Sequence, residues 1–310
     1  MKFSTVLCLL FSLFGLALVG FSPSLFVLQD GRSADRDTTI ISPNGILLHI
    51  SAGTFAPYSN AEVFVEIREY LETCELFGID MHMLSKEGEY LVSDGMIFLS
   101  ARKEGKTVEP KKPIEIWMPS SRIDTTMRRY APERSEDNRV IWRKLPISIE
   151  YHINRTRYYS YTINQSGWYS VQKPVAKEVA EMFVVNPKNK KDKKTKFLVK
   201  NKSYEHPMLR VIYLDMNTYF ELPEGEDGTF CLAKYNTPEN TILISKVITP
   251  ENKTWYFAKR LSEFEKKRGV YLINKEDYIV RRKNTERPVR TGNAPPTDEL
   301  LNSLCQRLFK

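Results

Sequence analysis

The sequence has few of the residues on which catalytic and metal sites most often depend. It contains four histidines and four cysteines in 310 residues. None of the histidines (His49, His82, His152 and His206) is followed four residues later by another, so the helical zinc-protease pattern is absent. The nucleophile elbow Gly-x-Ser-x-Gly and the phosphate-binding P-loop are also missing. We therefore predict a protein that is not an enzyme and uses no cofactor or metal.

The cysteines exclude one further class of site. Cys8, Cys74, Cys231 and Cys305 are far apart in the sequence, so no Cys-x-x-Cys metal or redox motif exists. Cys8 falls inside the N-terminal apolar segment. Two alternatives remain open for the other three: a Cys74–Cys231 bridge in an oxidising compartment, or three unpaired thiols.

The N-terminus predicts export. Met1 and Lys2 precede an apolar run of about 15 residues, the form of a secretory signal peptide. Ser22 and Ser24 suit cleavage after Ser24, which makes residues 1–24 the signal. Apolar residues resume at 25–28, so an uncleaved membrane anchor is the alternative. Either way we expect the chain in the periplasm or at the cell surface, with membrane association through this segment if it is retained.

Positive charge is in excess, with a formal net charge of +8 and a pI near 9.1. Residues 186–203 hold eight lysines and a single acid, Asp192. We predict a Lys-rich linker over 173–195. Lys190, Lys191, Lys193 and Lys194 are a candidate surface for an anionic envelope component. The alternative is a solvated loop whose lysines protect a sheet edge. No aromatic residue is interleaved before Phe197, so we expect no nucleic-acid partner.

Short alternating strands predict a β-sandwich domain over 36–172. In residues 61–68, Val63, Val65 and Ile67 share one face opposite charged residues. Residues 84–119 predict a meander of antiparallel strands, with turns at 86–89, 93–95 and 103–106 because a glycine follows an acid in each. We expect a polar loop over 122–138.

A smaller β-sandwich domain is predicted over 196–282, from several short strands separated by turns. Five acids lie close together here: Asp215, Glu221, Glu224, Glu226 and Asp227. They lack the spacing of a calcium loop, so we favour a solvated acidic turn.

The C-terminal residues 283–310 read as a basic tail followed by an amphipathic helix capped by Thr297. Its apolar stripe is a second candidate interaction surface, or else packs on the second domain: Leu300, Leu301, Leu304 and Leu308.

A set of turn and core residues carries a family resemblance. It comprises Gly45, Gly53 to Phe55, Val63 to Glu66, Ser93 to Ile97, Pro113 to Pro119 and Gly167-Trp168. In these residues the chain resembles exported Bacteroidetes-type cell-envelope proteins, with a β-sandwich similar to that of zonula-occludens proteins, ankyrins and netrin receptors. The resemblance covers about half of the chain and implies an interaction or scaffold module without a cofactor.

Together these features predict an all-β protein of two antiparallel β-sandwich domains. We expect a non-catalytic envelope protein that binds another envelope protein or a surface polymer. The alternative is a glycosidase-like envelope hydrolase, because two carboxylates can be placed on any β fold. Glu66, Glu69, Asp80 and Asp94 are too scattered in the sequence to name such a pair.

Overall fold

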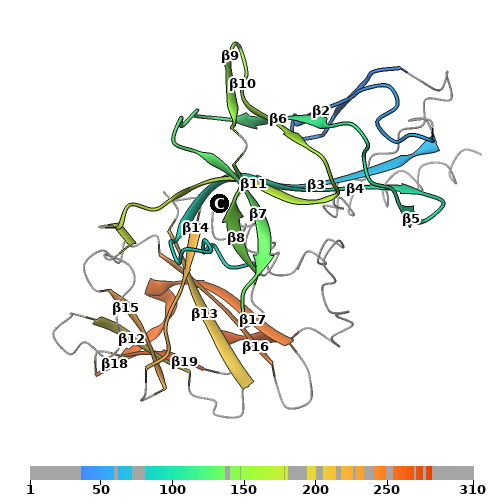
Figure 1. Cartoon of the computed structure of the whole chain (residues 1–310). Helices are drawn as coiled ribbons and strands as arrows, with labels where there is room; N and C mark the ends of the chain where they lie inside the picture. Colours follow the sequence, from blue (N-terminus) through green and yellow to red (C-terminus); the bar gives the residue numbers. More distant parts are fainter. Residues whose placement is uncertain are drawn as a thin grey trace, which may run out of the picture.

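The described residues form four β-sheets in which most strand pairs are antiparallel, which confirms the predicted all-β class. The structure is a computed structural model that describes residues 36–58, 62–71, 81–136, 140–146, 148–177, 179–180, 194–199, 205–213, 218–225, 228–233, 241–248, 254–268, 270–274 and 277–280. We number the sheets I to IV. Figure 1 shows sheets I and II in the upper half of the molecule and sheets III and IV in the lower half.

Sheets I and II belong to the first predicted domain. Sheet I has the order β1 (Thr38–Ile41), β2 (Leu47–Ile50), β6 (Ile114–Ser120), β10 (Arg157–Ile163), β9 (Glu150–Ile153). Sheet II has the order β3 (Phe64–Tyr70), β4 (Leu91–Lys103), β11 (Gly167–Pro174), β7 (Arg128–Arg134), β8 (Val140–Lys144), with β5 (Lys106–Thr107) paired to β4. Both sheets contribute inward residues to one core, which includes Ile116 and Tyr161 from sheet I and Val65 and Leu99 from sheet II.

Sheets III and IV belong to the second predicted domain. Sheet III has the order β14 (Thr218–Glu221), β13 (Glu205–Tyr213), β16 (Ile242–Ile248), β17 (Thr254–Arg260), β20 (Ile279–Val280). Sheet IV has the order β15 (Thr229–Ala233), β12 (Lys194–Val199), β19 (Val270–Ile273), β18 (Glu265–Lys267). A second core lies between them and includes Phe220 and Leu243 from sheet III and Phe197 and Leu232 from sheet IV.

A third core joins sheet II to sheet III. The outer face of sheet II supplies Phe98, Tyr130, Trp142 and Trp168, and the outer face of sheet III supplies its apolar side chains in return: Ile212, Tyr219, Ile242 and Ile244. Sheet II is therefore covered on both faces. This explains why β4 carries the unbroken buried run Met96–Leu99 rather than an apolar–polar alternation.

The predicted turn at 93–95 is wrong, because these residues lie inside β4 and do not separate two strands. The strand bulges there: the register with β11 shifts between Val171 and Gln172. Gly95 has a φ of +143°, and a Cβ at this position would lie 2.8 Å from Leu71 Cδ2 and 3.0 Å from Met118 Sδ. The glycine is thus required for close packing at a bulge and not for a chain reversal.

Two other local predictions need correction. The prediction of one meander over 84–119 is wrong because β4 and β6 belong to different sheets: β4 is in sheet II, whereas β6 pairs with β2 and β10 in sheet I. The loop over 122–138 contains the strand β7. The sequence of β7, RRYAPER, shows no apolar alternation. The reason is that an arginine, the buried Arg129, occupies an inward-facing position where an apolar residue would be expected. Arg129 lies 5.7 Å from the ring of Tyr161 and 5.8 Å from that of Tyr169, which replaces an apolar contact by cation–π packing.

Candidate functional site

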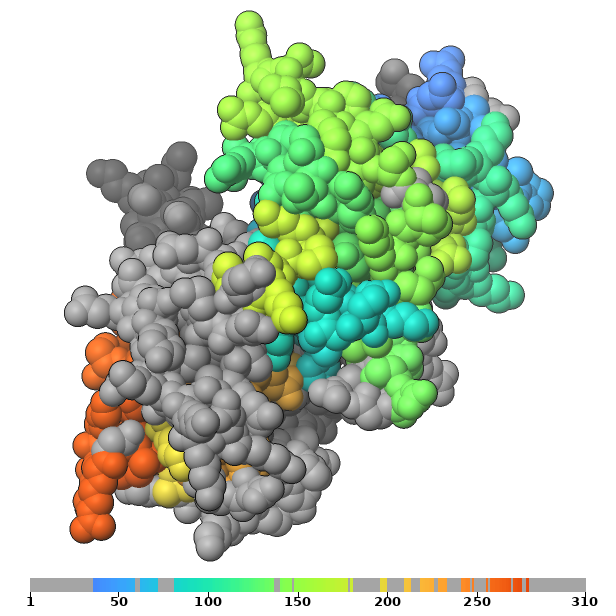
Figure 2. Space-filling view, turned by 60° about the vertical axis from the view of Figure 1, so that its left-hand side comes forward, coloured from blue at the N-terminus to red at the C-terminus, as the bar shows by residue number. Residues whose placement is uncertain are grey.

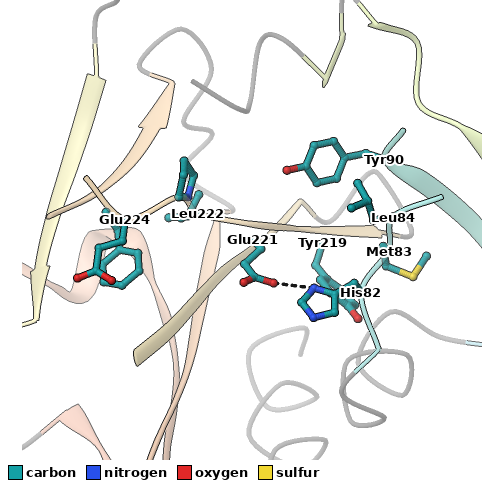
Figure 3. Close-up of a pocket in the computed structure, with 10 residues that line it drawn as sticks. His82, Met83, Leu84, Tyr90, Tyr219, Glu221, Leu222 and Glu224 are labelled. Carbon is teal, nitrogen blue, oxygen red and sulfur yellow. Dashed lines mark ion pairs between the residues drawn. The ribbon is translucent and has the colours of Figure 1, made fainter. Parts of the chain in front are cut away.

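A pocket of about 330 Å³ opens at the edge of the core that joins the domains. The first domain contributes His82, Met83, Leu84 and Tyr90. The second contributes Tyr219, Glu221, Leu222, Pro223, Glu224 and Phe230. Clefts between domains are common places for binding sites, and this volume is at the lower end of the range for small ligands or single side chains. We call this feature the interdomain pocket (Figure 3).

A tight hairpin before β4 positions the first-domain residues. The Ser85 hydroxyl accepts hydrogen bonds from the backbone N–H groups of Glu87 and Glu89 at 3.2 and 3.1 Å. Gly88 closes the turn with a φ of +83°. A bridge between Leu84 and Tyr90 holds the two arms together, so their side chains reach the same pocket.

Most of the second-domain residues come from β14, the edge strand of sheet III, and the turn that follows it; Phe230 comes from β15 in sheet IV. Glu221 lies opposite Arg210 in the β13–β14 register. Arg210 is 2% exposed, and its guanidinium packs 5.0 Å from the centre of the Tyr219 ring. Its Nε lies 4.0 Å from Glu221 Oε2. The buried guanidinium of Arg210 therefore lies next to the carboxylate of Glu221.

One ion pair crosses the pocket from domain to domain. His82 Nδ1 lies 2.8 Å from Glu221 Oε2, as the dashed line in Figure 3 marks. Glu221 thus faces His82 on one side and Arg210 on the other. Figure 3 places Glu224 at the end of the pocket away from His82. Glu224 is exposed, and the side chain of Glu221 is 35% exposed.

Contacts below the pocket hold its two walls together. The Thr218 hydroxyl donates a 2.6 Å hydrogen bond to the carbonyl of Leu91 inside the joined core. The rings of Tyr90 and Phe220 pack with their centres 4.8 Å apart. The pocket is consequently formed by packed elements of both domains, and it combines apolar and aromatic walls with the exposed Glu224.

The structure describes one of the candidate residues chosen from the sequence, Lys194, and it is not among the residues that line this pocket. Lys190, Lys191, Lys193 and the leucines of the C-terminal stripe (Leu300, Leu301, Leu304 and Leu308) lie outside the described residues. Lys194 is the first residue of β12, where it pairs with Ala233. Of the cysteines, the structure describes Cys231, which is a free and buried thiol.

The pocket residues were missed because they lie far apart in sequence. His82 reads as a packed or edge histidine, and Glu221 and Glu224 read as part of a solvated acidic turn. The other acids of that group, Asp215, Glu226 and Asp227, lie outside the described residues. The sequence signal for this pocket would have been two tyrosines and two acids near strand ends: Tyr90, Tyr219, Glu221 and Glu224. Such a combination is not specific to a binding pocket.

Comparison with known proteins gave no match to a family model, a curated protein or a solved structure. Within the described ranges, three or more His, Cys, Asp or Glu residues nowhere cluster closely enough to hold a metal ion. The described part of the chain also contains no helix with the length and apolar character needed to span a bilayer.

Proposed function

We propose that this chain is a non-catalytic binding protein of the cell envelope, and that its interdomain pocket receives a basic side chain of a partner protein. The observation that carries the proposal is the pocket itself. Met83, Leu84 and Phe230 provide apolar surface, and Glu224 adds a solvent-facing carboxylate at one end. A lysine or arginine side chain matches that surface, because its alkyl stem packs on apolar groups while its charged end stays near the carboxylate.

Two features of the pocket support binding in preference to chemistry. Glu221 already has His82 and Arg210 as cationic or hydrogen-bonding neighbours, so Glu224 is the lining carboxylate that has no ion-pair partner among the described residues. The shared core beneath the pocket also fixes both walls, which lowers the entropy cost of binding. The envelope location rests on the N-terminal export signal and on the resemblance described above.

The proposal is tested by co-purification of the tagged full chain from detergent-solubilised envelopes. Glu224→Lys reverses the charge at the pocket and should remove a stoichiometric partner. Glu87→Lys makes the same charge change on the exposed turn of residues 86–89 and should leave the partner bound. Retention of the partner by both variants would refute a basic side chain in the pocket.

An envelope hydrolase is the second candidate, because two carboxylates, Glu221 and Glu224, line one pocket. A glycosidase would place one carboxyl as acid and the other as nucleophile or base, about 5 to 10 Å apart across the substrate. Assay of the purified chain on envelope glycans, with Glu221→Gln and Glu224→Gln as controls, separates the two functions. Turnover lost in both variants would establish the hydrolase and displace the binding proposal.

A further inference from the structure

The hairpin of β9 and β10 projects from the end of sheet I. Its strands pair from Arg157 opposite Ile153 onward, and residues 154–156 form the turn. Figure 1 shows this hairpin at the top of the molecule, and Figure 2 shows it standing clear of the surface around it. Ile153 at the tip is 67% exposed, more than any other large apolar side chain of the described residues.

Positive charge surrounds this apolar tip. Arg155 and Arg157 are exposed on the hairpin, and Arg122 is exposed on the neighbouring loop. Arg157 Nη1 donates a 2.6 Å hydrogen bond to the Ser121 carbonyl, which ties the hairpin to that loop. The strands of the hairpin carry one acid, Glu150, which is exposed at the end of β9 away from the turn. The loop's own carboxylate, Asp124, is ion-paired with Lys173 at 2.5 Å. This end of the molecule therefore presents net positive charge.

Aromatic side chains follow next along the outer face of sheet I. The Trp117 ring stacks on His152 with centres 4.0 Å apart, and Tyr158 packs edge-on against Trp117 at 5.7 Å. All three are partly exposed. Arg155 lies in the turn, Ile153 and Arg157 face each other in the first pair of the hairpin, and the aromatic side chains follow. In proteins that touch a bilayer, tryptophan and tyrosine lie at the level of the headgroups.

We infer that the β9–β10 hairpin docks on an anionic lipid bilayer, with Ile153 entering the interface and Arg122, Arg155 and Arg157 facing the lipid phosphates. The arginines favour an anionic surface, because a basic side chain near an anionic membrane is attracted to it. Salt screens this attraction. The exposed isoleucine selects lipid over a soluble polyanion, because a polyanion offers no apolar phase to receive it. This contact is independent of the interdomain pocket and of the N-terminal segment.

The test is sedimentation of the purified full chain with vesicles of phosphatidylcholine alone or with 30% phosphatidylglycerol. We expect binding to rise with the anionic lipid and to fall with salt. Arg155→Gln with Arg157→Gln should lower the anionic-vesicle partition by roughly thirtyfold, about fivefold for each arginine. Ile153→Ser should lower it by about tenfold.

Matched variants control for charge and for apolar surface elsewhere. Lys106→Gln with Lys111→Gln removes two exposed charges near the β4–β5 hairpin, and Ile41→Ser removes an isoleucine that is 64% exposed on the opposite edge strand. Both controls should retain binding. Equal binding to the two vesicle types, or equal loss in hairpin and control variants, would overturn the inference.

Discussion

Thr218 offers a direct test of how tightly the two domains are joined. Its side chain is fully buried, and its hydroxyl donates a 2.6 Å hydrogen bond to the Leu91 carbonyl of the other domain. β3 pairs with β4 only from Met96 to Arg102, so no β3 donor reaches that carbonyl. Thr218→Val keeps the shape and removes the donor. Leaving a buried carbonyl without its partner costs about 1 to 3 kcal/mol.

Thr241 provides the matched control. It is also fully buried, but its hydroxyl has no hydrogen-bond partner within the described residues. Thr241→Val should therefore leave the free energy of unfolding unchanged or raise it by up to about 1 kcal/mol.

Urea unfolding followed by tryptophan fluorescence measures both variants. Trp142 and Trp168 lie in the core between the domains and report on its opening. We expect Thr218→Val to lower the unfolding midpoint at unchanged slope in one transition. Equal effects of the two substitutions, or separate transitions for the two domains in the wild-type chain, would refute the shared core as a source of stability.

Two further predictions concern titratable groups. Hydrogen bonds from Lys173 and Thr126 hold the pKa of Asp124 below its usual range, so the folded state binds that proton less readily than the unfolded state. Asp124→Asn should therefore cost up to about 1 kcal/mol at pH 7, and the difference from wild type should shrink as the pH falls below about 4; a difference that stays the same size from pH 4 to pH 2 would contradict this. Tyr161 is buried with a hydroxyl that has no partner among the described residues, and burial raises its pKa and takes that of Tyr169 to about 12. Tyr161→Phe should thus keep or raise thermal stability, and its advantage should grow above pH 10, where ionisation of the unfolded tyrosine favours unfolding of the wild type; a lower melting temperature would contradict it.

Local strand patterns were predictable wherever one face of a strand is buried. Val63, Val65 and Ile67 alternate in sequence and all enter the core between sheets I and II. The residues 96–99 carry no alternation, and only the structure shows that sheet III covers their second face. Gly95 illustrates the limit of turn signals: the same Asp-Gly pair serves a hairpin or a bulge, and the neighbouring Leu71 and Met118 side chains decide which.

The site depended on tertiary packing that sequence patterns do not encode. His82 and Glu221 belong to different domains, and only the stacking of sheet II on sheet III brings Nδ1 within 2.8 Å of Oε2. Arg210 stands in a mostly apolar run of the sequence, and the register places it opposite Glu221 in a buried position. An alternation of charge and apolar residues predicts which side of a strand is polar, but not which partner that side meets.

The most direct test of the binding proposal is photo-crosslinking from the interdomain pocket in intact cells. Leu84 lines the pocket and is partly exposed, so a benzoylphenylalanine placed there reaches whatever occupies it. We predict a crosslink to one partner protein, at a segment that contains a lysine or arginine, and loss of that crosslink on Glu224→Lys. Crosslinks to many proteins, or a single crosslink that Glu224→Lys leaves unchanged, would contradict the proposal.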